Sequence, residues 1–246
     1  MTSFVLVPSK KPTGQVKTTQ RDYILLDRSG SMSERWPQAL EAVNTYIRKL
    51  AVAGVNTKIT VAIFDHAYKV IRKDEVPASC RPITNADAEP RGCRHLNDAI
   101  GEIVALAKLD NPDRATLLIM TNGNVDCLEK LRPGQARALL TQCRLRGWQI
   151  LFLGIDYDTC HLAQQYGASA QEFISIEKDH IAPVMAKLAD KRAENVTIAF
   201  SALEKQESAN VLSREIMKST TRRISDDHAR KSLEGGNYIH DPGQSE

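Results

Sequence analysis

The sequence contains no long apolar run. Nowhere in its 246 residues do about 18 apolar residues follow one another, which is the length that a membrane-spanning helix needs. Residues 1–20 contain no apolar segment of the roughly 7 to 15 residues that is typical of a secretory signal. We therefore expect neither membrane insertion nor secretion, and we predict a cytoplasmic protein; the sequence does not separate a cellular from a viral origin.

The chain also has little excess charge of either sign. It carries 33 Lys and Arg residues against 30 Asp and Glu residues, a formal net charge of +3. A balance this even does not point to nucleic acid or to an anionic membrane as a partner. Basic residues between 218 and 231 could contact phosphates, but acidic residues interrupt them and no aromatic residue follows before Tyr238. Nucleic-acid binding by this tail is kept only as an alternative.

Cysteines are few and scattered along the chain. No two of them form a C-x-x-C pair, and no histidines follow at zinc-finger spacing. Their number is odd. We predict that all five are reduced thiols, several of them in the core: Cys80, Cys93, Cys127, Cys143 and Cys160.

Common catalytic and phosphate-binding motifs are missing as well. The sequence has no G-x-x-x-x-G-K-[ST] loop, no G-x-G-x-x-G turn and no G-x-S-x-G elbow. A metal-dependent phosphohydrolase that uses Asp27 as its nucleophile remains an alternative. In such enzymes a second carboxylate, two residues further on, acts as the general acid. Ser29 stands at that position here, and a serine hydroxyl cannot take this role. We therefore predict that the protein is not an enzyme.

What the sequence does contain is a regular alternation of buried strands and amphipathic helices. After a first strand that ends at Asp27, we predict strands at residues 58–64, 68–72, 115–121, 148–154 and 172–176. Helices are predicted at residues 35–53, 96–107, 133–146 and 161–166, with one more from residue 181. This order is typical of an α/β, doubly wound, mostly parallel sheet with one antiparallel edge strand and helices on both faces.

The two ends differ from the middle of the chain. We expect residues 1–20 to be an arm, residues 21–203 to be the main domain, and residues 204–246 to be a polar, partly helical extension. Either end could order on a partner or remain solvated. Self-association is left open.

A cluster of oxygen-bearing side chains follows the first strand. Asp27, Ser29 and Ser31 come directly after its apolar residues. In an open α/β sheet, ligands bind beside the carboxyl ends of the strands, and a carboxylate with two hydroxyls suits Mg²⁺, Mn²⁺ or Ca²⁺. The alternative is that these residues only cap the next helix.

The segment Asp27-Arg28-Ser29-Gly30-Ser31 resembles the D-x-S-x-S loop of the von Willebrand factor A (vWA) family, which includes the integrin I domain. The resemblance extends over roughly residues 22–177. It implies a vWA, Rossmann-like fold and a metal-ion-dependent adhesion site, in which a Thr from a second loop and an Asp from a third complete the ligands.

Two positions depart from this family pattern. Alignment of the second loop places Arg94 where the Thr ligand would stand, or Cys93 if the loop shifts by one residue, and the third loop carries Asn122 in place of the Asp. Both changes raise the formal charge of the site, and two unit charges about 4 Å apart interact by about 4 kcal/mol at an effective dielectric constant of 20. Arg94 is then expected to occupy the place of the ion and to bond Asp27 and Asn122.

Binding of Mg²⁺ is therefore expected to be weak or absent. The alternative is that Arg94 turns to solvent, and that Asp27, Ser29 and Ser31 hold Mg²⁺ together with water molecules. The predicted ligand set is degenerate: Asp27, Ser29, Ser31 and Asn122.

The resemblance implies a non-enzymatic protein–protein interaction module. We predict that it docks a partner through the loops at residues 27–33, 92–95 and 122–126, as a component of an intracellular multiprotein assembly. An acidic side chain of the partner would pair with Arg94. The predicted partner-binding residues are Ser33, Arg94, His95 and Asp126.

Overall fold

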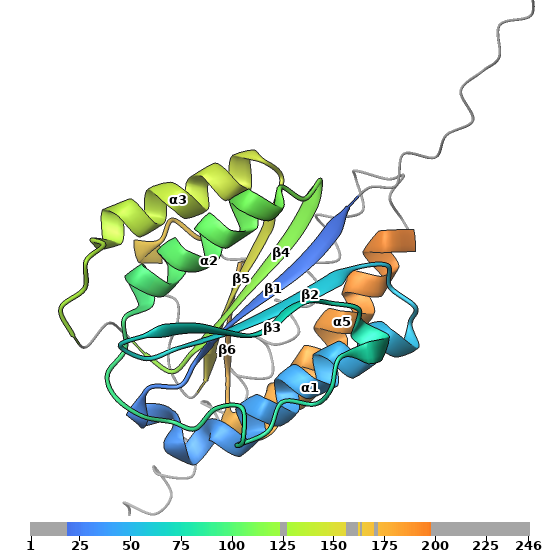
Figure 1. Ribbon diagram of the computed structural model, residues 1–246, viewed down its shortest axis with the longest axis horizontal. Helices are drawn as coiled ribbons and strands as arrows, with labels where there is room; N and C mark the ends of the chain where they lie inside the picture. The colour runs from blue at the N-terminus through green and yellow to red at the C-terminus, as the bar shows by residue number, and fades with distance from the viewer. Residues whose placement is uncertain (1–18, 124–126, 156–161, 163, 170–171, 198–246) are drawn as a thin grey trace, which may run out of the picture.

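The computed structural model describes residues 19–123, 127–155, 162, 164–169 and 172–197. These residues form one six-stranded sheet in the order β3-β2-β1-β4-β5-β6 (Figure 1). All neighbouring strands are parallel except β2 and β3, which form an antiparallel hairpin at one edge. The strands are β1 (Gln20–Asp27), β2 (Lys58–Phe64), β3 (Tyr68–Glu75), β4 (Arg114–Thr121), β5 (Gln149–Ile155) and β6 (Phe173–Ile176).

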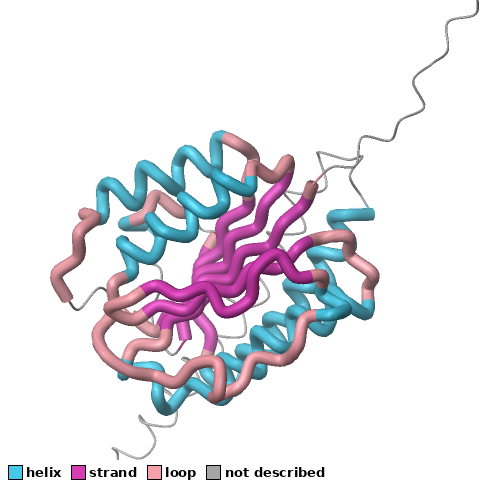
Figure 2. Tube along the Cα trace, in the orientation of Figure 1, coloured by secondary structure: helices cyan, strands magenta, loops and turns pink. Residues whose placement is uncertain are grey.

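Helices cover both faces of the sheet (Figure 2). Alternate side chains of β1 point to opposite faces, so that Ile24 and Leu26 pack in one core and Tyr23 and Leu25 in the other. The first core lies under α1 (Trp36–Val52) and α5 (Ile181–Thr197), the second under α2 (Leu96–Asp110) and α3 (Pro133–Leu145). Three short 3₁₀ turns complete the described elements: η1 (Gly30–Arg35), η2 (Pro77–Ser79) and η3 (Lys178–His180).

The predicted fold class and order of elements are confirmed. Element boundaries shift by a few residues: β3 extends to Glu75 instead of ending at residue 72, and α2 extends to Asp110 instead of ending at residue 107. The predicted helix at 161–166 lies partly outside the described residues, as do the N-terminal arm before residue 19 and the extension at 204–246. Within the described part of the chain, no helix combines the length and apolar character that crossing a membrane requires.

The sheet order decides where the ends of β1 and β4 lie. β1 pairs with β2 on one side and with β4 on the other, and Leu26 stands opposite Met120. The next residues along the two strands, Asp27 and Thr121, therefore emerge side by side at the carboxyl edge of the sheet. This is the reversal point at which open α/β sheets bind ligands.

The opposite end of β1 holds a buried charge. Asp22 is fully buried, and it accepts a hydrogen bond of 2.9 Å from Nε of Arg192, on α5. The hydroxyl of Thr57 donates to the second carboxylate oxygen at 2.7 Å, and Tyr46 lies at 3.4 Å from the first. The last described helix is thus fixed to the first strand by an ion pair in the interior.

A second buried ion pair fixes the long loop between β3 and α2. Arg72 donates two hydrogen bonds of 3.0 Å to the carboxylate of Asp87, and both side chains are almost fully buried. Arg72 also donates to the carbonyls of Arg81 and Pro82. The hydrogen bonds from Arg72 hold the pKa of Asp87 at about 2, below its ordinary value of 3.8. This Pro-containing loop is therefore anchored before it reaches the carboxyl edge of the sheet.

We expect the substitution Asp87→Asn to lower the free energy of unfolding by about 2 kcal/mol at pH 7. The pKa of Asp87 is lowered in the folded state, so its contribution is present above the ordinary pKa and is lost as the pH falls through the folded value. The difference between wild type and variant should therefore shrink from about pH 4 to about pH 2. Urea denaturation across this pH range measures it.

The control is Asp190→Asn, since Asp190 pairs with Lys49 on the surface, with both side chains about half exposed. That change should cost less than about 1 kcal/mol. A stability difference for Asp87→Asn that stays constant down to pH 2 would contradict the assignment.

Candidate functional site

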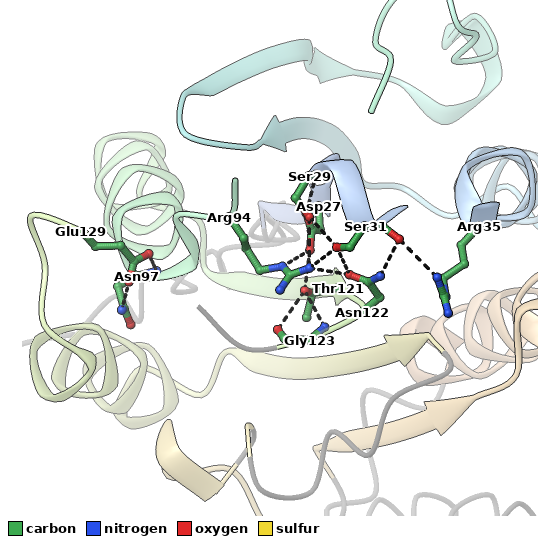
Figure 3. A network of polar contacts seen from close by, with 10 residues as sticks. All are labelled: Asp27, Ser29, Ser31, Arg35, Arg94, Asn97, Thr121, Asn122, Gly123 and Glu129. Carbon is green, nitrogen blue, oxygen red and sulfur yellow. Dashed lines mark hydrogen bonds and ion pairs between the residues drawn. The ribbon is translucent and has the colours of Figure 1, made fainter. Parts of the chain in front are cut away.

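A buried carboxylate stands at the end of β1. The side chain of Asp27 is fully buried, and both of its oxygens accept hydrogen bonds (Figure 3). Oδ1 accepts from the backbone amide of Ser29 at 2.8 Å, while Oδ2 accepts from Nε of Arg94 at 2.5 Å and from the hydroxyl of Thr121 at 2.6 Å. Asp27 is therefore paired with a cation and satisfied by two further donors.

The Arg94 guanidinium lies at the centre of the oxygen cluster (Figure 3). Its Nη2 donates to the hydroxyls of Ser29 and Ser31 at 3.1 and 2.6 Å, and to the amide oxygen of Asn122 at 2.5 Å. Only 4% of the Arg94 side chain is exposed. The contacts predicted between Arg94 and both Asp27 and Asn122 are confirmed, and the guanidinium faces inward.

Asn122 and the two serines also bond one another. Ser31 donates to Oδ1 of Asn122 at 2.9 Å, and Nδ2 of Asn122 donates to the carbonyl of Ser31 at 2.8 Å. The hydroxyls of Ser29 and Ser31 are 3.1 Å apart. Ser29 is the residue before η1 but makes no side-chain capping bond to it. These contacts therefore argue against the alternative that the side chains only cap the next helix.

Backbone hydrogen bonds bring the Arg94 loop to this place. The amide of Gly30 donates to the carbonyl of Gly92 at 2.9 Å, and the amide of Arg91 donates to the carbonyl of Arg28 at 2.7 Å. Gly92 has a φ of +63°, and a Cβ there would lie 2.6 Å from Nδ1 of His66. Only glycine fits this turn without strain.

A second ion cluster lies beside the first. Asp65, just after β2, is fully buried; it forms an ion pair with Nη2 of Arg28 at 3.0 Å and accepts a hydrogen bond from Nε of Arg91 at 2.9 Å. Burial acts to raise the pKa of Asp65, but the hydrogen bonds from Ala67 and Arg91 and the charge of Arg28 outweigh burial, so the pKa is lowered overall. Sequence reasoning missed this cluster, although Asp65 follows a predicted strand that ends at the same edge as Asp27.

Residues 129–131 are docked on the start of α2. Glu129 accepts from the backbone amide of Asn97 at 2.6 Å and also bonds its side-chain amide (Figure 3). Asp98 accepts from the amide of Leu131 at 2.7 Å. Burial raises the pKa of Glu129 above its ordinary value. No sequence motif indicated these contacts, because they join segments about 30 residues apart through the fold.

Cys93 and Cys127 form a disulfide. The prediction that all five cysteines are reduced thiols is wrong for these two, because the fold brings together loops that are 34 residues apart in sequence. Cys80 and Cys143 are free, as predicted, and Cys143 is buried. Cys160 lies outside the described residues.

The predicted partner-binding residues Ser33 and His95 make different local contacts. Ser33 is exposed on η1 and donates to the carbonyl of Gly30 at 2.7 Å. His95 is half-buried, and its Nδ1 is 3.6 Å from a carboxylate oxygen of Asp98. Asp126 lies outside the described residues. A partner-binding role for these residues and for Arg94 stays a prediction.

A divalent cation does not fit this arrangement. The oxygens that would hold it, from Asp27, Ser29, Ser31 and Asn122, all contact the guanidinium of Arg94 instead. Asp27 is the only anion among them, and Arg94 already neutralises it. A hard cation beside a buried guanidinium would be repelled, so ion binding would require Arg94 to leave.

Comparison with known proteins gives structural matches but no sequence matches. No protein-family model matches the chain, and no curated protein does. The vWF domain of the type V pili tip protein Mfa5 from Porphyromonas gingivalis superposes with a TM-score of 0.56 at 11% identity, over 76% of this chain and 97% of that one. The pilus adhesin SpaC from Lactobacillus rhamnosus GG gives 0.59 at 12% identity, over 74% of this chain and 31% of that one.

A third match is the manganese-loaded TRAP protein of Plasmodium vivax, with a TM-score of 0.52 at 14% identity, over 68% of this chain and 72% of that one. The chain thus has the fold of the vWA domains, which confirms the resemblance seen in its D-x-S-x-S segment. At identities this low, the structural matches show the fold alone, and the activity has to be argued from the residues of the site.

The prediction of a cytoplasmic protein is corrected by the same comparison. Two of the matched structures are named as a pilus tip protein and a pilus adhesin, which are surface proteins. The Cys93–Cys127 disulfide points the same way, because disulfides persist in oxidising surroundings and are rare in the cytosol. The lack of an apolar segment in residues 1–20 therefore does not decide where the protein is located.

We expect Arg94→Met to lower the free energy of unfolding by about 3 to 5 kcal/mol, because it leaves the buried carboxylate of Asp27 without its cation. Methionine keeps much of the volume of the arginine stem, so that the loss reports on charge more than on packing. Chemical denaturation at neutral pH measures the change.

Arg48→Met is the matched control. Arg48 pairs with Glu41 on the surface, and both side chains are more than half exposed. Its loss should cost less than about 1 kcal/mol. Equal effects of the two substitutions would show that the Arg94–Asp27 pair contributes no more than a surface ion pair.

Proposed function

We propose that this chain is a non-enzymatic protein-interaction module of the vWA type, in which an internal arginine replaces the divalent ion of the adhesion site. The partner docks on the face formed by residues 27–33, 91–95 and the chain around Asn122. The module works as one component of a multiprotein assembly. Docking on this face does not require Mg²⁺, Mn²⁺ or Ca²⁺.

The observation that carries the proposal is the position of Arg94. Its Nε and Nη2 bond a carboxylate and two hydroxyls of the first loop and an amide oxygen of the third, while Arg94 itself stands on the second of the three loops that hold the ion in the family pattern. A guanidinium is planar and stays charged, so it can satisfy several oxygens at once. The loops are then organised by a covalently attached cation.

The proposed face offers a partner both hydroxyls and positive charge. Ser31 and Ser33 are exposed, and Asn122 is half-buried. The Arg91 side chain is 60% exposed, whereas that of Arg94 is 4% exposed. An acidic side chain of the partner would therefore meet Arg91 at the rim, and Arg94 would act from below by holding Ser31 and Asn122 in place.

Two further considerations support a binding role over catalysis. Among the described residues, no histidine bonds Ser29 or Ser31, so neither hydroxyl has the general base that a serine nucleophile needs. Proteins matched by fold include a pilus tip protein and a pilus adhesin, and the second name describes adhesion. The same kind of role is proposed for this chain.

Restoring the family residues should create an ion site. We expect the double variant Arg94→Thr with Asn122→Asp to bind Mn²⁺ or Mg²⁺ at least about a hundredfold more tightly than wild type. The substitutions remove one positive charge and add one negative charge, and each unit charge at about 4 Å is worth about 4 kcal/mol at an effective dielectric constant of 20. Isothermal titration calorimetry on the folded proteins measures both affinities.

Asn122→Asp alone is the control, because Arg94 remains there to neutralise the new carboxylate. It should bind these ions no more tightly than wild type. Sub-micromolar affinity of the wild type would overturn the role given to Arg94, and an unchanged affinity of the double variant would show that the loops are aligned wrongly with the family.

Docking itself should be sensitive to bulk on the proposed face and insensitive to chelation. With a partner captured by affinity purification and identified, we expect Ser31→Arg to weaken binding at least about tenfold, because the interface would have to accommodate a long side chain where a small exposed hydroxyl stood. Addition of EDTA should leave wild-type binding unchanged. Surface plasmon resonance with the purified partner measures both effects.

Leu109→Arg introduces the same side chain at the far end of α2, where Leu109 is 84% exposed. It should leave binding unchanged. Loss of binding in EDTA would contradict the metal-independent role, and equal binding by Ser31→Arg and wild type would move the docking surface away from this face.

A further inference from the structure

Three side chains with metal-binding atoms meet beside Arg94. The Cys93–Cys127 disulfide joins the loop before α2 to the segment after β4, and its Cα atoms are 6.2 Å apart. One ligand atom each from Cys93, His95 and Cys127 lies within 4.8 Å of the others. All three residues are half-buried. The group is thus compact and still reachable from solvent.

The chemistry of this group differs from that of the oxygen cluster around Asp27. Two thiolates and an imidazole are ligands for Zn²⁺ and similar ions, whereas Mg²⁺ and Ca²⁺ prefer oxygen. Zinc sites that keep an open position often have three protein ligands and a water molecule. Ligands around one tetrahedral zinc ion lie roughly 3.3 to 3.8 Å apart, given zinc–sulfur and zinc–nitrogen bonds of about 2.3 and 2.0 Å.

A carboxylate stands beside the imidazole. Nδ1 of His95 is 3.6 Å from Oδ2 of Asp98, and Asp98 is held in turn by the backbone amides of Lys130 and Leu131. In zinc proteins, the ring nitrogen that does not bind the metal commonly faces a carboxylate, which fixes the orientation of the ring. The other nitrogen of His95, Nε2, is then the one left for a metal.

We propose that Cys93, His95 and Cys127 form a Zn²⁺-class metal site when the disulfide is reduced. Reduction by a dithiol transfers two electrons and two protons to the two sulfurs, and the dithiol is oxidised to its own disulfide. The metal then binds the two sulfurs as thiolates and releases both protons to solvent. The oxidised and metal-bound forms are alternatives, because the sulfurs cannot bond each other and both ligate the ion.

This site goes beyond docking, although the two are neighbours. Cys93 and His95 flank Arg94 in the chain, so either the disulfide or the metal fixes the loop from which the guanidinium reaches Asp27. Free Cys80 and Cys143 are not members of the group. The site can therefore be tested separately from the oxygen cluster.

The test is titration of the full-length protein with Co²⁺, which reports thiolate ligands by a charge-transfer absorption and tetrahedral geometry by visible bands. The disulfide is first reduced by a phosphine, which takes up oxygen from water as the phosphine oxide while the sulfurs gain two protons. We expect the reduced protein to bind one equivalent of Co²⁺ with both signals, and Zn²⁺ to displace it. The oxidised protein should show neither signal.

Variants locate the ligands. Cys93→Ser with Cys127→Ser should abolish the charge-transfer absorption, and Cys80→Ser should leave it unchanged. His95→Ala and Asp98→Asn should each weaken Zn²⁺ binding by at least about tenfold, while His66→Ala should not. A reduced protein without the charge-transfer absorption, or an absorption that persists in the double cysteine variant, overturns the proposal.

Thermal unfolding gives a second readout that does not depend on the double variant folding normally. Zn²⁺ should raise the midpoint of the reduced wild type, because a ligand that binds only the folded state stabilises it. The same addition should leave the midpoint of the oxidised wild type unchanged. Equal midpoints of the reduced wild type with and without Zn²⁺ also overturn the proposal.

Discussion

The buried pair of Arg94 and Asp27 is the interaction on which the carboxyl edge of this sheet depends. Taking two charges out of water is costly, and their attraction offsets that cost only when the remaining donors and acceptors are also satisfied. Here the amide of Ser29 and the hydroxyl of Thr121 complete the hydrogen bonding of the carboxylate, and Asn122 accepts from Nη2 of the guanidinium. One side chain thus links the ends of β1 and β4 to the loop before α2. The geometry of all three segments follows from its position.

The surrounding residues suit a tethered cation better than an exchangeable one. Asp65 binds Arg28 and Arg91 directly beside the first pair, so this edge contains two buried carboxylates and three arginines. Such an edge has no net negative charge with which to attract a divalent ion. The chain has the fold of the vWA domains, but the electrostatics of this edge are set by side chains that cannot diffuse away. Proteins that share a fold differ in function through changes of this kind at the site.

The sequence predicts much of this edge, because the decisive signals are local. An apolar run that ends at Asp27 places the carboxylate at the end of a strand, and the family pattern places Arg94 and Asn122 opposite it. The disulfide and the contacts of Glu129 do not follow from local signals, since they join loops that are more than 30 residues apart in sequence and that only the tertiary fold brings together. Asp65 was overlooked for another reason. Its partners are arginines in two separate loops, and single arginines carry no spacing pattern that distinguishes a buried ion pair from a solvated one.

The ion pair at the other end of β1 has a consequence for how the chain folds. Asp22 meets Arg192, which is 170 positions later in the chain. Until that arginine has left the ribosome, the carboxylate of Asp22 has, among the described residues that bond it, Thr57 and Tyr46 but no counter-charge. Contacts between such distant positions also carry a large loop-closure entropy and slow the search for the native topology. The environment of β1 is therefore among the last in the described domain to be completed, and a nascent chain that stops short of α5 leaves part of one apolar face of the sheet open to association with other chains.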